Sequence, residues 1–190
     1  MINSANKKLI AFTAPSGSGK TTIVRHLLDT RDDLAFSVSA TTRQKRDGEK
    51  HGVHYYYLSV ETFKLWASED GFVEWEEVYE NQFYGTPHFE IQRLWGQGKQ
   101  AIFDIDVKGA MNIKHHYGDQ AVVIFIKAPS MDAIIQRLKD RQTESEQSLQ
   151  KRIQRIEEEM KYADQADYVL VNDDLEIAKK EAERILAEIV

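Results

Sequence analysis

The chain contains no cysteine, only three prolines and no long apolar run, and each shortage excludes a class of protein. Without cysteine there is no disulfide and no thiolate metal site. No apolar run approaches the roughly 20 residues that a membrane span needs, and the first residues lack the apolar segment of a secretory signal. The formal net charge of −6 argues against a broad nucleic-acid-binding surface, which would be basic. We therefore expect a cytoplasmic protein that binds neither nucleic acid nor membrane.

Short apolar runs alternate with helical patterns along the 190 residues, a length that suits one core. The runs that we expect to form buried strands cover 9–13, 35–38, 101–106, 121–126 and 168–171. Between them, apolar residues recur at helical spacing, as they do after the first run and at the end of the chain. This alternation is typical of βαβ units, so we predict an α/β fold in which helices flank a parallel sheet.

Two segments depart from this alternation. Residues 43–86 are rich in Tyr, Glu, His and Gly, with short β-like stretches and a helix that Ser59 could cap, so we expect an insertion outside the parallel sheet. Residues 137–155 are dense in charge, and Thr143 with Glu146 fits a capping box. The helix that follows this box carries an apolar stripe of Leu149, Ile153, Ile156 and Met160.

The stretch after the first run nearly matches the phosphate-binding loop G-x-x-x-x-G-K-[ST], with Ala14 in place of the first glycine. Backbone N–H groups of such a loop converge on phosphate oxygens, Lys20 would reach the β- and γ-phosphates, and the Thr21 hydroxyl would bind Mg²⁺. A plain glycine-serine turn is the alternative, which the position between a strand and an amphipathic helix disfavours. The predicted ATP-binding residues are Ala14, Pro15, Ser16, Gly17, Ser18, Gly19, Lys20, Thr21 and Thr22. We also predict a negative φ at Ala14, where a methyl group is tolerated.

Other charged residues could complete a phosphate site. Asp104 closes an apolar run and could hold Mg²⁺ directly or through water, or could only connect neighbouring loops. Arg43 and Arg46 lie three residues apart after the second run and suit a phosphate group, because a guanidinium binds its oxygens bidentately. Taken alone, these two arginines would more often belong to a solvated loop.

Together, the motifs resemble the guanylate kinase family. They are S-x-S-x-T-T-R-x-x-R-x-G-E ending at Glu49, G-x-x-Y ending at Tyr55, F-V-E-W from Phe72, Y-G-T from Tyr84, D-I-D-V-K-G from Asp104, R-x-x-x-R-x-T-E-x-E from Arg137 and V-N-D-D-L from Val171. The motifs cover essentially the whole chain, in the order and at the spacing of that family. The resemblance implies ATP-dependent transfer of a phosphoryl group to GMP, or to dGMP, with Mg²⁺ as cofactor, giving ADP and a nucleoside diphosphate.

The resemblance also implies three parts. A core would comprise 1–38, 87–136 and 156–190, a GMP-binding region 39–86, and a helical lid 137–155 that closes over both nucleotides. The implied ligands of the GMP phosphate are Arg43, Arg46, Tyr55 and Tyr84. The residues implied around the guanine are Ser39, Glu74, Thr86 and Asp106. Without the resemblance, Glu74 would be read as a solvated strand residue and Asp106 as a helix cap.

The implied catalytic residues are cations, because phosphoryl transfer concentrates negative charge between two nucleotides. They are Lys20, Arg43, Arg137, Arg141 and Arg152, whereas Lys139, Lys151 and Arg155 are expected to be solvated. Asn172 is implied near the adenine of ATP, with a plain turn residue as the alternative.

Two alternative functions stay open. A non-catalytic module that binds proteins would have a degraded phosphate loop, whereas Gly19, Lys20 and Thr21 are intact. A kinase for another nucleoside monophosphate is disfavoured by Glu74 and Asp106, whose carboxylates suit the N1–H and N2 amine donors of guanine. We expect a monomer or a homodimer.

Overall fold

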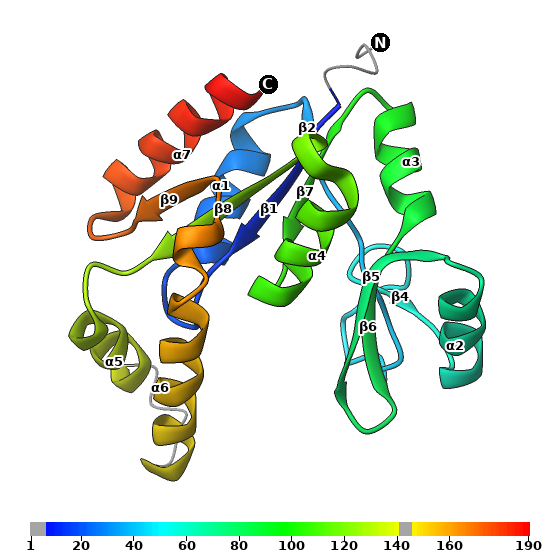
Figure 1. Cartoon of the computed structure of the whole chain (residues 1–190), viewed down its shortest axis with the longest axis horizontal. Coiled ribbons are helices and arrows are strands. Elements are labelled where there is room, and N and C mark those ends of the chain that lie inside the picture. Colours follow the sequence, from blue (N-terminus) through cyan, green and yellow to red (C-terminus); the bar gives the residue numbers. More distant parts are fainter. Residues whose placement is uncertain (1–6, 141–145) are drawn as a thin grey trace.

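A computed structural model describes residues 7–140 and 146–190 of the chain. Its larger sheet has five parallel strands in the spatial order β2-β7-β1-β8-β9 (Figure 1). The strands are β1 (Leu9–Thr13), β2 (Leu34–Phe36), β7 (Gln100–Asp104), β8 (Ala121–Lys127) and β9 (Tyr168–Val171). Each strand falls on one of the apolar runs, and the α/β fold with a parallel sheet is confirmed.

Two of these strands end earlier than the apolar runs predict. Strand β2 ends at Phe36, and the backbone N–H of Val38 donates to the Glu90 carboxylate at 3.1 Å rather than to a neighbouring strand. Strand β7 ends at Asp104, because Asp106 caps the next helix by accepting a hydrogen bond from Gly109 N at 2.9 Å. Both strands therefore end in loops that carry candidate site residues.

Helices cover both faces of the parallel sheet (Figure 1). Helices α1 (Lys20–Thr30) and α7 (Leu175–Ile189) pack on one face, where their apolar stripes meet Ile10 and Phe12 of β1. Helices α3 (His88–Gly96) and α4 (Val107–Tyr117) pack on the other face, against Leu9 and Ala11. Because successive side chains of a strand alternate between its faces, β1 contributes to both cores. None of the helices in the described part of the chain is long and apolar enough to cross a membrane.

The inserted region forms a second, mixed sheet in the order β4-β3-β6-β5, with one helix, outside the parallel sheet. Its elements are β3 (Ala40–Thr41), β4 (Tyr56–Tyr57), α2 (Val60–Ser68), β5 (Phe72–Tyr79) and β6 (Gln82–Pro87). Ser59 caps α2 as predicted, accepting from Thr62 N at 3.1 Å. The Phe63 ring stacks against the rings of Phe72 and Phe83, at centroid distances of 4.3 and 5.3 Å, and forms a separate small core.

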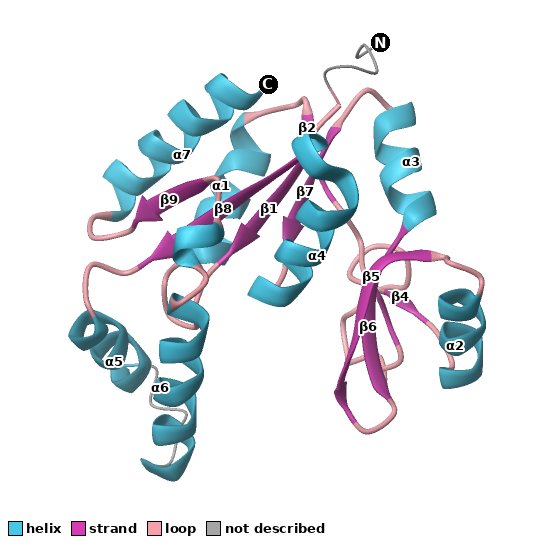
Figure 2. Ribbon diagram, in the orientation of Figure 1, coloured by secondary structure: helices cyan, strands magenta, loops and turns pink. Residues whose placement is uncertain are grey.

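Two further helices follow β8, namely α5 (Met131–Asp140) and α6 (Glu146–Met160). Ile134 and Leu138 of α5 pack against Ile156 of α6, so the two helices share a core of their own. Both helices extend beyond the 137–155 expected for a lid, and the division of the chain into three parts stays a prediction. Thr143, the proposed cap of α6, lies outside the described residues. Helix α6 and the inserted region lie on opposite sides of the view below the parallel sheet (Figure 2).

Candidate active site

The phosphate loop joins β1 to α1 and has a left-handed backbone at Gly17 and Gly19, where φ is 88° and 89°. Positive φ among the described non-glycine residues occurs at Asp70 and Asn81, so the negative φ predicted for Ala14 is confirmed. The methyl group of Ala14 packs against the core instead of distorting the loop. Alternating backbone conformations of this kind turn successive N–H groups toward one anion.

Asn172, which directly follows β9, holds the phosphate loop through its side chain. Its side-chain amide donates to the carbonyl oxygen of Ser18 at 2.8 Å, and the residue is only 5% exposed. A Cβ at Gly19 would overlap the same amide, so glycine is required there for close approach as well as for its backbone angle. Asn172 therefore contacts the phosphate loop, while its position near the adenine stays a prediction.

Lys20 and Thr21, the first two residues of α1, both reach the end of β7. The Lys20 Nζ atom lies 2.6 Å from Asp104 Oδ1 and donates to the Ile105 carbonyl oxygen at 2.9 Å. The Thr21 hydroxyl donates to the other oxygen of Asp104 at 3.2 Å. A hydroxyl and a carboxylate side by side are oxygen ligands of the kind that Mg²⁺ prefers, so these residues fit the ion.

A cavity of about 470 Å³ lies over the phosphate loop. Its walls are the loop itself, the segment 104–106 after β7, and Arg152, Arg155, Ile156 and Glu159 of α6. These four residues share one face of the helix because they are spaced three and four residues apart. Arg152 thus lines the cavity over the phosphate loop, while its catalytic role stays a prediction. Arg155 was expected to be solvated, and its side chain is 63% exposed, but its guanidinium donates to Glu159 at 2.8 Å on the cavity wall.

The other two implied lid arginines are not placed in this cavity. The Arg137 guanidinium donates to the backbone carbonyl oxygen of Asn172 at 3.1 Å, so Arg137 contacts the turn between β9 and α7. Arg141 lies outside the described residues.

A smaller cavity of about 170 Å³ lies beside the first and shares the segment 104–106 with it. Five of the implied GMP-site residues line this cavity, namely Ser39, Tyr55, Glu74, Tyr84 and Asp106. Thr86 supports Glu74 by donating its hydroxyl to Oε1 at 2.6 Å. Asp106 also caps α4, so its interpretation as a helix cap is confirmed, while its position beside the guanine stays a prediction. Gly109 leaves room for this arrangement, because a Cβ there would lie 3.2 Å from Glu74 Oε2.

Burial raises the pKa of Glu74 to about 7 from an ordinary 4.5. The hydrogen bond from Thr86 opposes this increase, whereas the nearby charges of Asp106 and Glu76 add to it. The carboxylates of Glu74 and Asp106 thus lie close together in one cavity, where a ligand with hydrogen-bond donors would relieve their repulsion.

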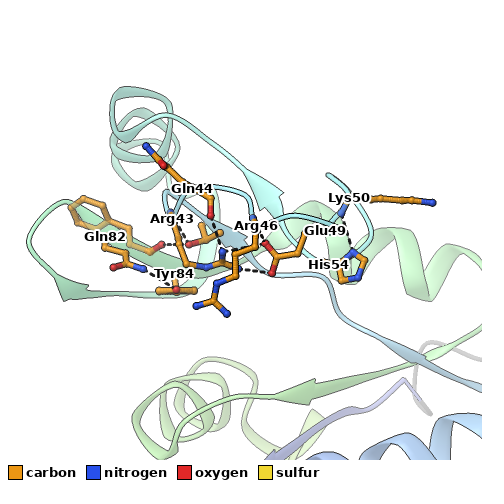
Figure 3. Close-up of polar contacts among 10 residues, drawn as sticks. Arg43, Gln44, Arg46, Glu49, Lys50, His54, Gln82 and Tyr84 are labelled. Atoms are coloured by element: carbon orange, nitrogen blue, oxygen red, sulfur yellow. Dashed lines mark hydrogen bonds and ion pairs between the residues drawn. The ribbon is translucent and has the colours of Figure 1, made fainter. Parts of the chain in front are cut away.

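Arg43 is held by Glu49 (Figure 3), close to Tyr55, which lines the smaller cavity. Its guanidinium donates to both Glu49 oxygens, at 2.8 and 3.1 Å, and lies 5.4 Å from the centroid of the Tyr55 ring. The Arg43 guanidinium and the backbone N–H of Arg46 hold the pKa of Glu49 at about 2. The Arg46 guanidinium makes no hydrogen bond or ion pair with any residue that the structure describes. Arg43 thus lies against the ring of Tyr55, which lines the cavity.

Three charged residues of this region were missed from sequence. Glu49 was quoted within a motif without a role, and Arg155 was assigned to solvent. Glu90 is completely buried in α3, between the apolar residues that face the sheet. A charged residue beside Ile91 and Leu94 on an apolar stripe was a signal that could have identified it.

Comparisons with known proteins agree with this geometry. The family model described as guanylate kinase matches residues 6–189. The chain is 43% identical to guanylate kinase from Bacteroides fragilis over 95% of this chain and 89% of the relative. It is 46% identical to guanylate kinase from Salinibacter ruber over 93% of each chain. The crystal structure of guanylate kinase from Anaplasma phagocytophilum matches with a TM-score of 0.72 at 27% identity, covering 97% of this chain and 87% of that one. This chain therefore belongs to the guanylate kinase family.

Proposed function

We propose that this guanylate kinase, an ATP:GMP phosphotransferase, binds ATP in the cavity over the phosphate loop and GMP in the smaller cavity beside it. One observation carries this assignment. The two cavities share the segment 104–106, so that a phosphate on the loop and a phosphate held by Arg43 would face each other across it. A direct transfer needs its donor and acceptor phosphates in such proximity.

On the ATP side, the backbone N–H groups of the loop bind the phosphates and Lys20 neutralises their charge. In the absence of ATP, the Lys20 ammonium is held at Asp104 and would exchange this partner for the β- and γ-phosphates. Thr21 and Asp104 would hold Mg²⁺, which supplies further neutralisation of the triphosphate when bound. Asn172 keeps the loop in shape through its bond to Ser18.

On the acceptor side, Glu74 and Asp106 accept hydrogen bonds from the N1–H and N2 amine groups of guanine. Thr86 orients Glu74, and the Ser39 hydroxyl is available to the guanine O6 oxygen. The GMP phosphate is bound by the guanidinium groups of Arg43 and Arg46 and by the hydroxyl groups of Tyr55 and Tyr84. This distribution follows the contacts, since Arg43 lies against the ring of Tyr55, whereas Glu74 and Asp106 themselves line the cavity.

Transfer is a single displacement in this proposal. An oxygen of the GMP phosphate attacks the γ-phosphorus of ATP while the bond from that phosphorus to the bridging oxygen breaks, and ADP leaves. No side chain forms a covalent bond. Lys20, Arg43 and Arg152 stabilise the charge spread over the migrating group, and Arg137 and Arg141 are proposed to join them when α5 and α6 close.

The test of the acceptor is ADP release from ATP and Mg²⁺ with GMP, dGMP, AMP, UMP or dTMP. We expect turnover with GMP and dGMP, and a kcat/KM for AMP roughly 10⁴-fold lower, because adenine would leave both partly buried carboxylates without donors. Equal or faster turnover with AMP would overturn the guanine assignment. No turnover with any acceptor would favour a non-catalytic module that binds proteins, although the intact loop disfavours it.

The KM for GMP is expected to depend on pH through Glu74. With a pKa of about 7, this carboxyl is half protonated in the free enzyme at neutral pH, and only the ionised form accepts from two guanine donors. The KM for GMP should rise up to tenfold for each pH unit below 7 and should become constant above pH 7. The KM for ATP should not show this pH dependence. Steady-state kinetics between pH 5.5 and 8.5 measure both, and a flat GMP profile would contradict the proposal.

The titration of Glu74 also affects the stability of the fold, and a rise in pH acts on stability in the direction opposite to its effect on GMP binding. Because burial puts the pKa of Glu74 in the folded chain above its ordinary 4.5, folding favours the protonated form. Its contribution to stability is therefore complete below pH 4.5 and is lost as the pH rises through 7.

The proposal also covers the whole molecule. The protein is cytoplasmic and is a monomer or a homodimer, its partners are ATP and GMP, and its chain divides into the three parts named above.

A further inference from the structure

Two short segments join the inserted region to the rest of the molecule. The chain enters it between β2 and β3, through 37–39, and leaves it from β6 into α3, through Pro87 and His88. Glu90, the third residue of α3, lies where these two segments pass each other, and its side chain is completely buried.

The Glu90 carboxylate is bonded to both sides of this junction. Its Oε1 atom accepts from Val38 N at 3.1 Å, on the entering segment, and its Oε2 atom accepts from the Tyr56 hydroxyl at 2.9 Å, on β4. Arg93, one turn further along α3, donates to both oxygens, at 2.7 and 2.8 Å. A single carboxylate thus connects α3 to the entering segment and to the second sheet.

Glu90 is charged in this position. Burial alone would raise its pKa, but the hydrogen bonds from Arg93, Val38 and Tyr56 lower it below the ordinary value. A buried carboxylate whose oxygens each accept two hydrogen bonds has little freedom to move, so it fixes the groups that donate to it.

Each bonded element carries a GMP-site residue next to the bond. Ser39 follows Val38, Tyr55 precedes Tyr56, and the carbonyl oxygen of Ser39 accepts from Tyr56 N at 2.9 Å. Another wall of the small cavity belongs to the core, because Asp106 caps α4, which packs against the parallel sheet. The relative positions of Ser39, Tyr55 and Asp106 therefore depend on how the inserted region is attached.

We propose that Glu90 is a positioning residue for the acceptor nucleotide, which sets the placement of Ser39 and Tyr55 relative to Asp106 through its bonds to Val38 and Tyr56. The inference rests on the proposed assignment of the small cavity to GMP. Glu90 contacts no substrate in this proposal and acts only through the segments that it bonds.

The test compares Glu90→Gln with Tyr56→Phe. The Gln variant places an amide N–H₂ against donors that need an acceptor, and we expect the KM for GMP to rise roughly tenfold with the KM for ATP unchanged. Tyr56→Phe removes one hydroxyl and keeps the ring, so it should fold normally and raise the KM for GMP severalfold in the same selective way. Glu61→Gln, the same change at an exposed carboxylate of α2, is the matched control and should alter neither constant.

Three results separate this role from a purely structural one. Selective loss of GMP affinity in both variants, with a combined variant no worse than Glu90→Gln alone, supports the proposal. Equal loss of GMP and ATP affinity in Tyr56→Phe, or an unchanged KM for GMP in both variants, overturns it. Failure of the assignment of the small cavity to GMP is distinguishable, because Glu74→Gln, a change in the wall of that cavity, would then leave the KM for GMP unchanged.

Discussion

Replacing Lys20 by alanine is expected to lower kcat by roughly 1,000-fold, while the KM for GMP stays within a factor of about three. The reason is that the Lys20 ammonium is the cation that the fold holds over the phosphate loop, at the beginning of α1 and beside Asp104. Its charge is required most where negative charge shifts to the β,γ-bridging oxygen during transfer. The acceptor cavity contains no atom of Lys20, so GMP binding should be largely preserved.

The measurement is steady-state ADP release with ATP and GMP varied separately, together with a thermal unfolding curve. Lys20 is partly exposed and its pair with Asp104 is close to the surface, so the Tm should shift by no more than about 4 °C. Lys180→Ala, at an exposed position of α7, is the control and should leave kcat unchanged. Full activity in the Lys20 variant would remove the proposed role of the loop, and a large fall in Tm would mean that lost folding explains the result.

The strands of the parallel sheet were predictable because their signal is local. A run such as 121–126 is buried on both faces, and every one of its residues is apolar. The phosphate loop was also predictable, including the negative φ at Ala14, because its glycines, lysine and threonine are consecutive in the sequence. Local patterns thus predict the strand, the loop and the helix that follows it, while the binding of ATP there stays a prediction.

The contacts between distant segments were not predictable in this way. Glu90 is bonded to Val38 and Tyr56, which lie 52 and 34 residues away along the chain, and no spacing rule connects them. Arg155 is a charged residue in a charge-rich helix, where side chains are usually solvated. The packing of α6 over the phosphate loop brings it to the wall of a cavity. The same limit applies to Arg137, whose partner at Asn172 lies beyond another helix and strand.

The electrostatic character of Glu74 depends on the same tertiary contacts. Glu76 lies two residues further along on the same face of β5, so the alternation of the strand alone does not separate it from Glu74. The pKa of Glu74 is raised by its burial and by the charges of Asp106 and Glu76, against the hydrogen bond from Thr86 on β6, and these contacts form only in the folded chain. Selectivity for guanine is therefore proposed to be a property of the junction between the two sheets.

Replacing Glu74 by glutamine tests whether this carboxylate gives the selectivity for guanine. We expect kcat/KM for GMP to fall about 100-fold. Guanine presents two adjacent donors, and the side-chain amide of glutamine can accept from one of them only by turning its own N–H₂ toward the other. The loss should appear mainly in the KM for GMP. The KM for ATP should be unchanged. The ratio of kcat/KM for GMP to kcat/KM for AMP should decrease, because adenine would no longer leave the Glu74 carboxylate without a donor.

The variant should also lose the increase in the KM for GMP below pH 7, because the group that titrates there has been removed. Glu77→Gln makes the same chemical change on the opposite face of β5, where its carboxylate is exposed and accepts from the Asn81 backbone at 2.7 Å. A glutamine can still accept this bond, so the control should behave like the unmodified protein. If Glu74→Gln kept both its GMP affinity and the pH dependence, Asp106 alone would have to accept the hydrogen bonds from guanine. Asp106 is the other carboxylate proposed to accept from the two guanine donors.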